Sequence, residues 1–117
     1  MNDKKEIGIK GEKFTVKFLK RNKYKILLRN FSIDNGEIDI IAHNKEYIVF
    51  VEVKTRAEGS MLEPRFSVDM KKRENIIDTS NRFLDKYKTD LTIRYDISEV
   101  TYDKSGKMKI NYIKNAF

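Results

Sequence analysis

The apolar positions of the N-terminal segment recur with the 3.6-residue period of an amphipathic helix. From residue 3 to about residue 22, apolar or small side chains share one side: Ile7, Gly11, Phe14, Thr15, Phe18 and Leu19. Basic residues fall within about 100° of one another on the same helical wheel: Lys10, Lys13, Lys17, Lys20 and Arg21. The pattern predicts a helix with one face on the core and a basic face beside it. Gly8 and Gly11 lower helix propensity, and we expect both to permit close packing on a sheet.

Three short extended segments follow, at residues 25–31, 37–43 and 47–56. Turn signals separate them at residues 34–36 and 44–46. This spacing predicts a three-stranded meander. The third segment contains Ile48-Val49-Phe50-Val51, which is apolar on both faces of a pleated strand. We therefore expect that strand at the centre of the sheet, with both faces covered.

The C-terminal half begins with a loop-like stretch at residues 57–66, and a second amphipathic helix is predicted at about 68–88. Two further strands are predicted at 93–102 and 108–113. The order helix, three strands, helix, two strands predicts an α/β fold in which a mixed β-sheet is flanked by helices.

The size and composition of the chain limit its organisation. A chain of 117 residues with 39% hydrophobic side chains predicts one domain spanning residues 1–117. Cysteine is absent, which excludes thiol catalysis, disulfides and thiolate zinc sites. No apolar run approaches the roughly 18 residues that cross a bilayer, and the N-terminus lacks the apolar stretch of a secretory signal. We therefore expect no membrane association and a cytoplasmic location.

The excess of positive charge lies at one end of the chain. Residues 1–30 hold ten basic and three acidic side chains, whereas residues 31–117 hold fifteen of each, which leaves a net charge of +7. Such asymmetry is typical of proteins that bind polyanions, with nucleic-acid backbones first and anionic membrane surfaces second. The alternative is a lysine-rich composition that serves only solubility.

Charged residues interrupt the strands that are predicted to be buried. Glu52 and Lys54 share one face of the third strand, and Glu37 and Asp39 share one face of the second, because side chains alternate along a strand. In a regular hairpin, Asp39 approaches Glu52 only when the connecting loop has an even number of residues. Loops of 44–45 or 44–47 meet this condition, and a loop of 44–46 requires a bulge.

Two converging carboxylates repel each other unless a proton or a cation lies between them. Oxygen ligands without cysteine favour Mg²⁺ or Mn²⁺, and a lysine on the same face can orient a water or stabilise developing charge. These groups suit metal-activated hydrolysis of a phosphodiester. The alternative is a buried salt-bridge network, in which Glu52 pairs with Lys54 or Arg94 and Asp39 pairs with Arg56. We expect Arg94 and Asp96 to form a structural salt bridge.

Asp39 followed by Glu52-Val53-Lys54 resembles the D…E-x-K signature of the restriction-endonuclease-like nuclease superfamily. Segments along the whole chain resemble the YraN-like uncharacterised protein family: Gly8-x-x-Gly11-Glu12, Arg29-Asn30-Phe31, residues 36–42, 49–56 and 68–72, Arg94-Tyr95-Asp96-Ile97, and Asn115-Ala116-Phe117. The resemblance implies a restriction-endonuclease-like core of the Holliday-junction-resolvase type.

The resemblance also implies roles for individual residues. Asp39, Glu52 and Glu12 would be acidic metal-site residues, Lys54 the catalytic lysine, and Lys72 an auxiliary phosphate or water contact. Glu12 falls within the apolar arc of its helix, and its neighbours three and four positions away are not cations, so we expect it to point toward the sheet. Lys72 precedes Ile76 by four residues and extends the core-facing stripe of its helix.

These observations lead us to expect a metal-dependent nuclease that acts on structured or branched DNA, with Mg²⁺ or Mn²⁺ held by Asp39, Glu52 and Glu12. Nucleic acid, DNA more than RNA, would be contacted by basic residues: Lys10, Lys13, Lys17, Arg21, Arg56 and Lys72. The alternative function is a non-catalytic adaptor that binds nucleic acid on the same fold. A homodimer is expected by analogy with junction-processing relatives.

Overall fold

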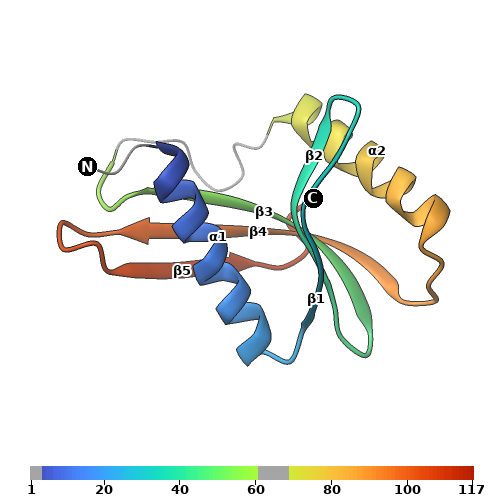
Figure 1. Ribbon diagram of the computed structural model, residues 1–117, viewed down its shortest axis with the longest axis horizontal. Coiled ribbons are helices and arrows are strands. Elements are labelled where there is room, and N and C mark those ends of the chain that lie inside the picture. The colour runs from blue at the N-terminus through green and yellow to red at the C-terminus, as the bar shows by residue number, and fades with distance from the viewer. Residues whose placement is uncertain (1–3, 61–68) are drawn as a thin grey trace.

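The computed structural model describes residues 4–60 and 69–117. Its elements are, in chain order, α1 (Lys4–Arg21), β1 (Lys25–Ile33), β2 (Gly36–His43), β3 (Tyr47–Ala57), α2 (Met70–Lys86), β4 (Thr92–Tyr102) and β5 (Met108–Ile113), as Figure 1 shows. The predicted order of helices and strands is confirmed. The predicted helix start at residue 68 and most of the predicted loop lie outside the described residues, and α2 ends two residues earlier than predicted.

The strands form one five-stranded sheet in the order β1-β2-β3-β4-β5. The first three strands make the predicted antiparallel meander, β3 and β4 run parallel, and β5 returns antiparallel to β4. A parallel pair needs a crossover connection, and α2 lies within it. The sheet is therefore mixed, with β3 at its centre, as its apolar sequence predicts.

The two helices cover opposite faces of β3. Phe50 of β3 packs in one buried cluster with Ile76 and Phe83 of α2. Val49 and Val51 belong to a second buried cluster with Leu19 of α1. Because adjacent side chains of a strand point to opposite faces, the two clusters lie on the two sides of the sheet. Neither helix in the described part of the chain is long and apolar enough to cross a membrane.

The two glycines of α1 differ in their surroundings. A Cβ atom at Gly11 would overlap the side chain of Thr55 on β3, so the predicted close approach of helix and sheet is confirmed there. A Cβ atom at Gly8 would meet no atom within 4 Å. The expectation that Gly8 also permits close packing is wrong, because the helix has already diverged from the sheet at that turn.

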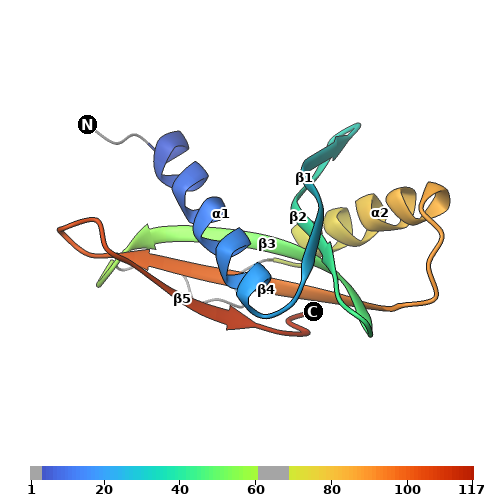
Figure 2. The same cartoon turned by 60° about the horizontal axis from the view of Figure 1, so that its bottom comes forward.

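The β1–β2 hairpin rises away from the rest of the sheet and stands between α1 and α2 (Figures 1 and 2). The antiparallel pairing of β2 with β3 runs from His43 opposite Ile48 to Ile40 opposite Val51. Beyond that point the hairpin tip contacts α2 instead. Asp34 pairs with Arg82, and a Cβ atom at Gly36 would overlap Thr79. The two strands therefore separate beside Asp39 and Glu52.

A buried polar network joins β4 to the C-terminus. Asp96 is fully buried and accepts hydrogen bonds from the guanidinium of Arg94, from the hydroxyl of Tyr112 at 2.6 Å and from the backbone N–H of Asn115 at 2.9 Å. Arg94 also donates to the hydroxyl of Tyr24. The predicted structural salt bridge between Arg94 and Asp96 is confirmed. Because several groups donate hydrogen bonds to the Asp96 carboxylate, these bonds offset the desolvation cost of burying its charge.

Candidate functional site

Asp39 and Glu52 face each other where β2 and β3 separate. The pair His43 and Ile48 closes a loop of residues 44–47, one of the two even-numbered loops expected from the sequence. Continuing this register by one step beyond Ile40 and Val51 places Asp39 opposite Glu52. The Asp39 Oδ2 atom accepts a hydrogen bond from the backbone N–H of Val53 at 2.8 Å. The side chain of Asp39 thus accepts from a backbone N–H of β3 that lies beyond the last paired residues of β2 and β3.

The two carboxyl groups interact directly. Burial, the charge of Glu52 and a hydrogen bond between the two side chains raise the pKa of Asp39 to about 8, against the lowering effect of the Val53 hydrogen bond. Glu52 is only 7% exposed. Two carboxyl groups in contact and largely shielded from solvent hold a proton near neutral pH, and they provide a place for a cation when that proton is lost.

Lys72 supplies the positive charge nearest to Glu52. Its Nζ atom lies 2.5 Å from Glu52 Oε2. The lysine stands in the first turn of α2, where the Asp69 side chain caps the helix by accepting from the Lys72 backbone N–H at 2.8 Å. Burial lowers the pKa of Lys72, but the hydrogen bond and charge of Glu52 and the charge of Asp39 leave that pKa raised. The cap therefore orients a lysine that stays protonated beside the carboxylates.

The salt-bridge network considered from the sequence is wrong in its partners. Glu52 pairs with Lys72, and Arg94 pairs with Asp96. Arg56 pairs with Glu99 at 3.0 Å. The sequence indicated Lys72 through the family resemblance and through its helical spacing from Ile76, but not its ion pair with Glu52, because a contact between β3 and α2 depends on the crossover geometry.

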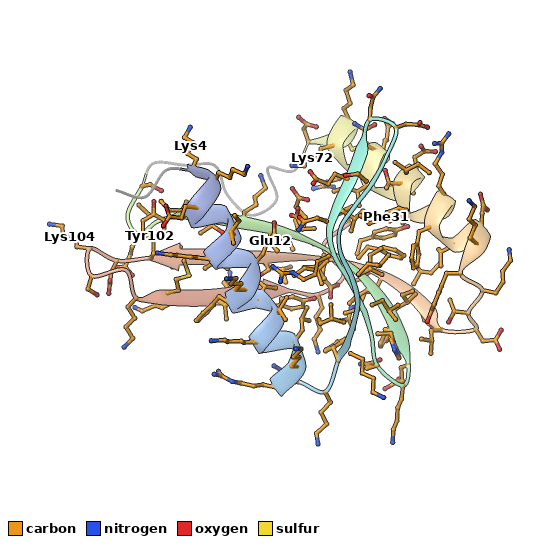
Figure 3. All side chains as sticks on the ribbon, in the orientation of Figure 1. Lys4, Glu12, Phe31, Lys72, Tyr102 and Lys104 are labelled. Carbon is orange, nitrogen blue, oxygen red and sulfur yellow. The ribbon has the colours of Figure 1, made fainter. Side chains whose placement is uncertain are left out.

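Glu12 approaches the same region from α1. Figure 3 shows Glu12 and Lys72 extending from the two helices on either side of the hairpin. The Glu12 side chain is 17% exposed and lies 3.7 Å from Arg29 on β1, and the Asn30 side chain donates to it. Burial and the charge of Glu37 raise the pKa of Glu12, partly offset by Asn30 and Arg29. The predicted orientation toward the sheet is confirmed, and its partners come from β1.

Arg29 and Asn30 are site residues to which the sequence assigned no role. They belonged to a segment quoted for its family resemblance. The backbone of Asn30 has φ 53°, in the left-handed region that Asn adopts more readily than most residues. The left-handed backbone at Asn30 marks it as an unusual position within a strand. The residue type alone does not reveal this conformation, so the sequence could not single Asn30 out on that ground.

A cleft of about 380 Å³ opens beside the two carboxylates. We call it the carboxylate cleft. Within the described residues its walls are formed by Asn35, Gly36, Glu37, Asp39, Glu52, Asp69, Lys71, Lys72, Asn75 and Ile76. Lys54 shares the Glu52 face of β3 by alternation and is half-buried, but it does not line this cleft.

The donor chemistry of the carboxylate cleft fits a hard divalent cation, because Asp39 and Glu52 offer paired carboxylate oxygens. Residues 4–60 and 69–117 contain no group of three or more His, Cys, Asp or Glu side chains close enough to hold a metal ion. Besides burial and the charge of Glu52, the charge of Glu12 raises the pKa of Asp39, so Glu12 lies near the carboxylate pair. The metal site of Asp39, Glu52 and Glu12 stays a prediction, and so does the catalytic role of Lys54.

The basic residues of α1 point away from the carboxylate cleft. Gly11, Thr15 and Leu19 form the buried side of this helix. At about 100° per residue, the basic face is centred roughly opposite that side. Its members are exposed: Lys10, Lys13, Lys17 and Arg21. Of the residues predicted to contact nucleic acid, only Lys72 lines the carboxylate cleft.

Fold and site together define an α/β protein in which β2 and the central strand β3 each contribute one carboxyl group to a pair, at a cleft between a strand hairpin and a helix. The chain belongs to the uncharacterised protein family UPF0102, the YraN family, whose model matches residues 11–100. The family resemblance noted in the sequence is thereby confirmed.

Curated relatives in this family match the chain along nearly its whole length. A UPF0102 protein of Acetivibrio thermocellus is 43% identical over 122 residues, covering 99% of this chain and 94% of the relative. One from Geobacter metallireducens is 43% identical and covers 97% of this chain and 93% of its own. A relative from Porphyromonas gingivalis is 36% identical, covering 100% and 87% respectively. The names of these relatives state the family to which they belong and do not state an activity.

Proposed function

We propose that the protein is a metal-dependent nuclease that hydrolyses phosphodiester bonds in structured or branched DNA. The observation that carries this proposal is the contact between the carboxyl groups of half-buried Asp39 and buried Glu52, with Lys72 beside them at an open cleft. A buried like-charge pair costs stability, and such arrangements are concentrated at functional sites.

In the proposed hydrolysis, each residue of the site would have a separate role. Asp39 and Glu52 would hold Mg²⁺ or Mn²⁺, which when bound would polarise a phosphoryl oxygen and lower the pKa of a water. Asp39 must first release its proton. Lys72, half of whose side chain is exposed, then turns from Glu52 to a phosphate oxygen of the substrate. Lys54 orients the attacking water from the Glu52 face of β3. Water would add to phosphorus and give up a proton to solvent, while the bond from phosphorus to the leaving oxygen breaks and that oxygen takes up a proton from solvent.

Two separate surfaces support a branched or structured substrate. The carboxylate cleft lies beside the hairpin, whereas the exposed lysines of α1 are turned away from it. A nucleic acid that contacts both surfaces must present phosphates in more than one direction. Contacts of this kind carry no base sequence information, so we expect little sequence preference. A homodimer would bring two clefts to one substrate and stays a prediction by analogy.

The second candidate function is a non-catalytic adaptor that binds nucleic acid. It is favoured by the ion pair between Lys72 and Glu52, which neutralises one carboxylate without a metal, and by the lack of a three-carboxylate group in the described part of the chain. On this hypothesis, binding depends on salt and is indifferent to EDTA, and no strand is cut.

Calorimetric titration of Mn²⁺ and Mg²⁺ into wild type and into the Asp39→Asn, Glu52→Gln double variant tests the proposal. Both proteins are then incubated with labelled linear, flap and four-way-junction DNA. We expect wild type to bind metal and cut, and the double variant to lose both properties. If wild type binds no metal, and the double variant is no more stable to denaturant than wild type but binds DNA equally well, the carboxylates are structural and the adaptor hypothesis replaces the nuclease.

A further inference from the structure

Three adjoining depressions follow the line along which the hairpin tip lies over α2. The carboxylate cleft is the first. The second, of about 230 Å³, shares Asn35, Gly36 and Asn75 with it. The third, of about 300 Å³, shares Ile33 and Arg82 with the second. Shared walls place the three in series along one side of α2, from its first turn to its last.

The third depression differs from the other two in chemistry. Its walls are Phe31 and Ile33 of β1 with Arg82, Phe83, Lys86 and Tyr87 of the α2 end, and we call it the aromatic groove. Phe31 meets Phe83 edge to face with ring centroids 5.4 Å apart, and Phe83 stacks on Tyr87 at 5.1 Å. Phe83 is buried, whereas Phe31 and Tyr87 are half-buried and present part of their surface to the groove. Figure 3 shows Phe31 between the hairpin and α2.

Aromatic surface bordered by cations is the combination that binds unpaired nucleotides. A base stacks on an aromatic side chain whatever its identity, and Arg or Lys contacts the adjoining phosphate. Lys86 is exposed at the rim, and Arg82 stands between the second and third depressions, where it also pairs with Asp34 of the hairpin tip. The groove walls include no acidic side chain among the described residues. Its charge therefore complements a phosphate better than it complements an acidic peptide.

We propose that the aromatic groove binds an unpaired base of the nucleic-acid strand whose backbone enters the carboxylate cleft. The inference rests on the proposed function for its ligand, and it narrows the substrate to duplex DNA with a single-stranded flank. Fourteen residues separate Lys72 from Lys86, which corresponds to about 21 Å along the helix axis. A stacked strand advances about 3.4 Å per nucleotide, so about six nucleotides connect the cleft to the groove.

The test measures binding of the full chain to labelled duplexes with unpaired flanks of 0, 2, 4, 6 and 8 nucleotides, by fluorescence anisotropy in EDTA so that no strand is cut. We expect the affinity of wild type to rise about tenfold between the blunt duplex and the six-nucleotide flank and then to level off. Phe31→Leu and Tyr87→Leu should lose this gain while binding the blunt duplex as wild type does. Tyr102→Leu, which removes a half-buried aromatic at the far end of β4, serves as the matched control.

Lys86→Ala and Lys104→Ala compare an exposed lysine at the groove with one in the β4–β5 turn. Only Lys86→Ala should weaken binding of the six-nucleotide flank. Because Phe31 also packs on the core, a second measurement uses wild type alone. The fluorescent base 2-aminopurine, placed at each flank position in turn, should be quenched most strongly about six nucleotides from the duplex.

The results separate this inference from the proposed function. If wild type binds blunt duplex but gains nothing from a flank, or if all variants gain equally, the groove does not bind a base and the nuclease proposal is untouched. If wild type binds no DNA, both proposals fail. If Phe31→Leu abolishes a dimer seen by sedimentation velocity while the flank gain persists, a second copy of the chain occupies the groove and the inference is overturned.

Discussion

The ammonium group of Lys72 lies 2.5 Å from a carboxylate oxygen of Glu52, and Glu52 in turn contacts the carboxyl group of Asp39. The lysine therefore occupies the side of the carboxylate pair from which a cation would neutralise it. Half of the Lys72 side chain is exposed, so it can leave this position without opening the core. If the carboxylate pair binds a divalent cation as proposed, Lys72 and that cation would compete for the same oxygen.

Replacing Lys72 tests this competition. In Lys72→Met, we expect Mn²⁺ to bind several-fold more tightly, because no ammonium group has to be displaced. The same substitution should lower the free energy of unfolding at pH 8 by about 1–2 kcal/mol, since Glu52 loses its charged partner. Calorimetry and urea unfolding measure the two effects. Lys71→Met, on the neighbouring cleft residue, is the control, and equal or weaker Mn²⁺ binding in Lys72→Met would contradict the competition.

The raised pKa of Asp39 makes stability depend on pH. The value is about 8 in the folded protein against 3.8 for an ordinary Asp. Between these pH values the folded protein holds a proton that the unfolded chain has released. The free energy of unfolding therefore falls as pH rises from 4 to 8, by at most about 1.4 kcal/mol per pH unit, and the loss is complete above pH 8.

Asp39→Asn should flatten this profile and should be more stable than wild type at pH 9, because the amide oxygen can still accept from Val53. Urea unfolding at pH 5, 7 and 9 measures the free energy of unfolding of both proteins, with Asp85→Asn on the exposed side of α2 as control. Metal affinity of wild type should rise with pH over the same range, since the ligand must lose its proton. A wild-type profile parallel to that of Asp39→Asn would show that Asp39 is ionised throughout.

The pairing of β2 and β3 explains how much of the site the sequence could predict. Strand alternation gave the condition under which Asp39 reaches Glu52, an even-numbered loop, because this is a local property of one hairpin. The turn predicted at residues 44–46 does not meet that condition, whereas the observed loop of 44–47 does. The polarity pattern of α1 similarly predicted that Glu12 turns inward. These inferences needed no knowledge of how distant elements pack.

The partners of these residues depend on contacts that no local pattern encodes. Lys72 reaches Glu52 only because α2 crosses back over β3, and Arg29 reaches Glu12 only because the β1–β2 hairpin bends toward α1. A shift in register in β1, between Ile26 and Leu28, accompanies this bend. The sequence carries no strong signal for a bulge at that position, so the hairpin itself could be predicted but its bend beside the carboxylate cleft could not.

The two glycines of α1 should respond to substitution with opposite signs. Gly11→Ala forces a methyl group against Thr55, and we expect a loss of about 1–3 kcal/mol in the free energy of unfolding. Gly8→Ala meets open space and improves helix propensity, so a gain of up to about 1 kcal/mol is expected. Urea unfolding of the two variants side by side measures both changes. Destabilisation by Gly8→Ala would mean that α1 lies closer to the sheet at its first turns.

The exposed basic face of α1 should contribute affinity for nucleic acid without contributing to chemistry. Replacing Lys10, Lys13, Lys17 and Arg21 by Gln removes four positive charges from the side of α1 opposite its buried residues. If all four contact phosphates, the slope of log affinity against log salt becomes less steep by about 3.6, at roughly 0.9 per contact on duplex DNA. Mn²⁺ affinity should stay as in wild type, because the carboxylate cleft contains none of the four.

A matched variant separates the position of these charges from their number. Lys104, Lys107, Lys109 and Lys114 are exposed in or near the β4–β5 hairpin, and replacing them by Gln removes the same net charge. Binding to four-way-junction DNA, measured from 50 to 300 mM salt in EDTA, should change little in this control. Equal loss in the two variants would mean that net charge alone drives binding, and α1 would then carry no specific role in holding the second arm of a branched substrate.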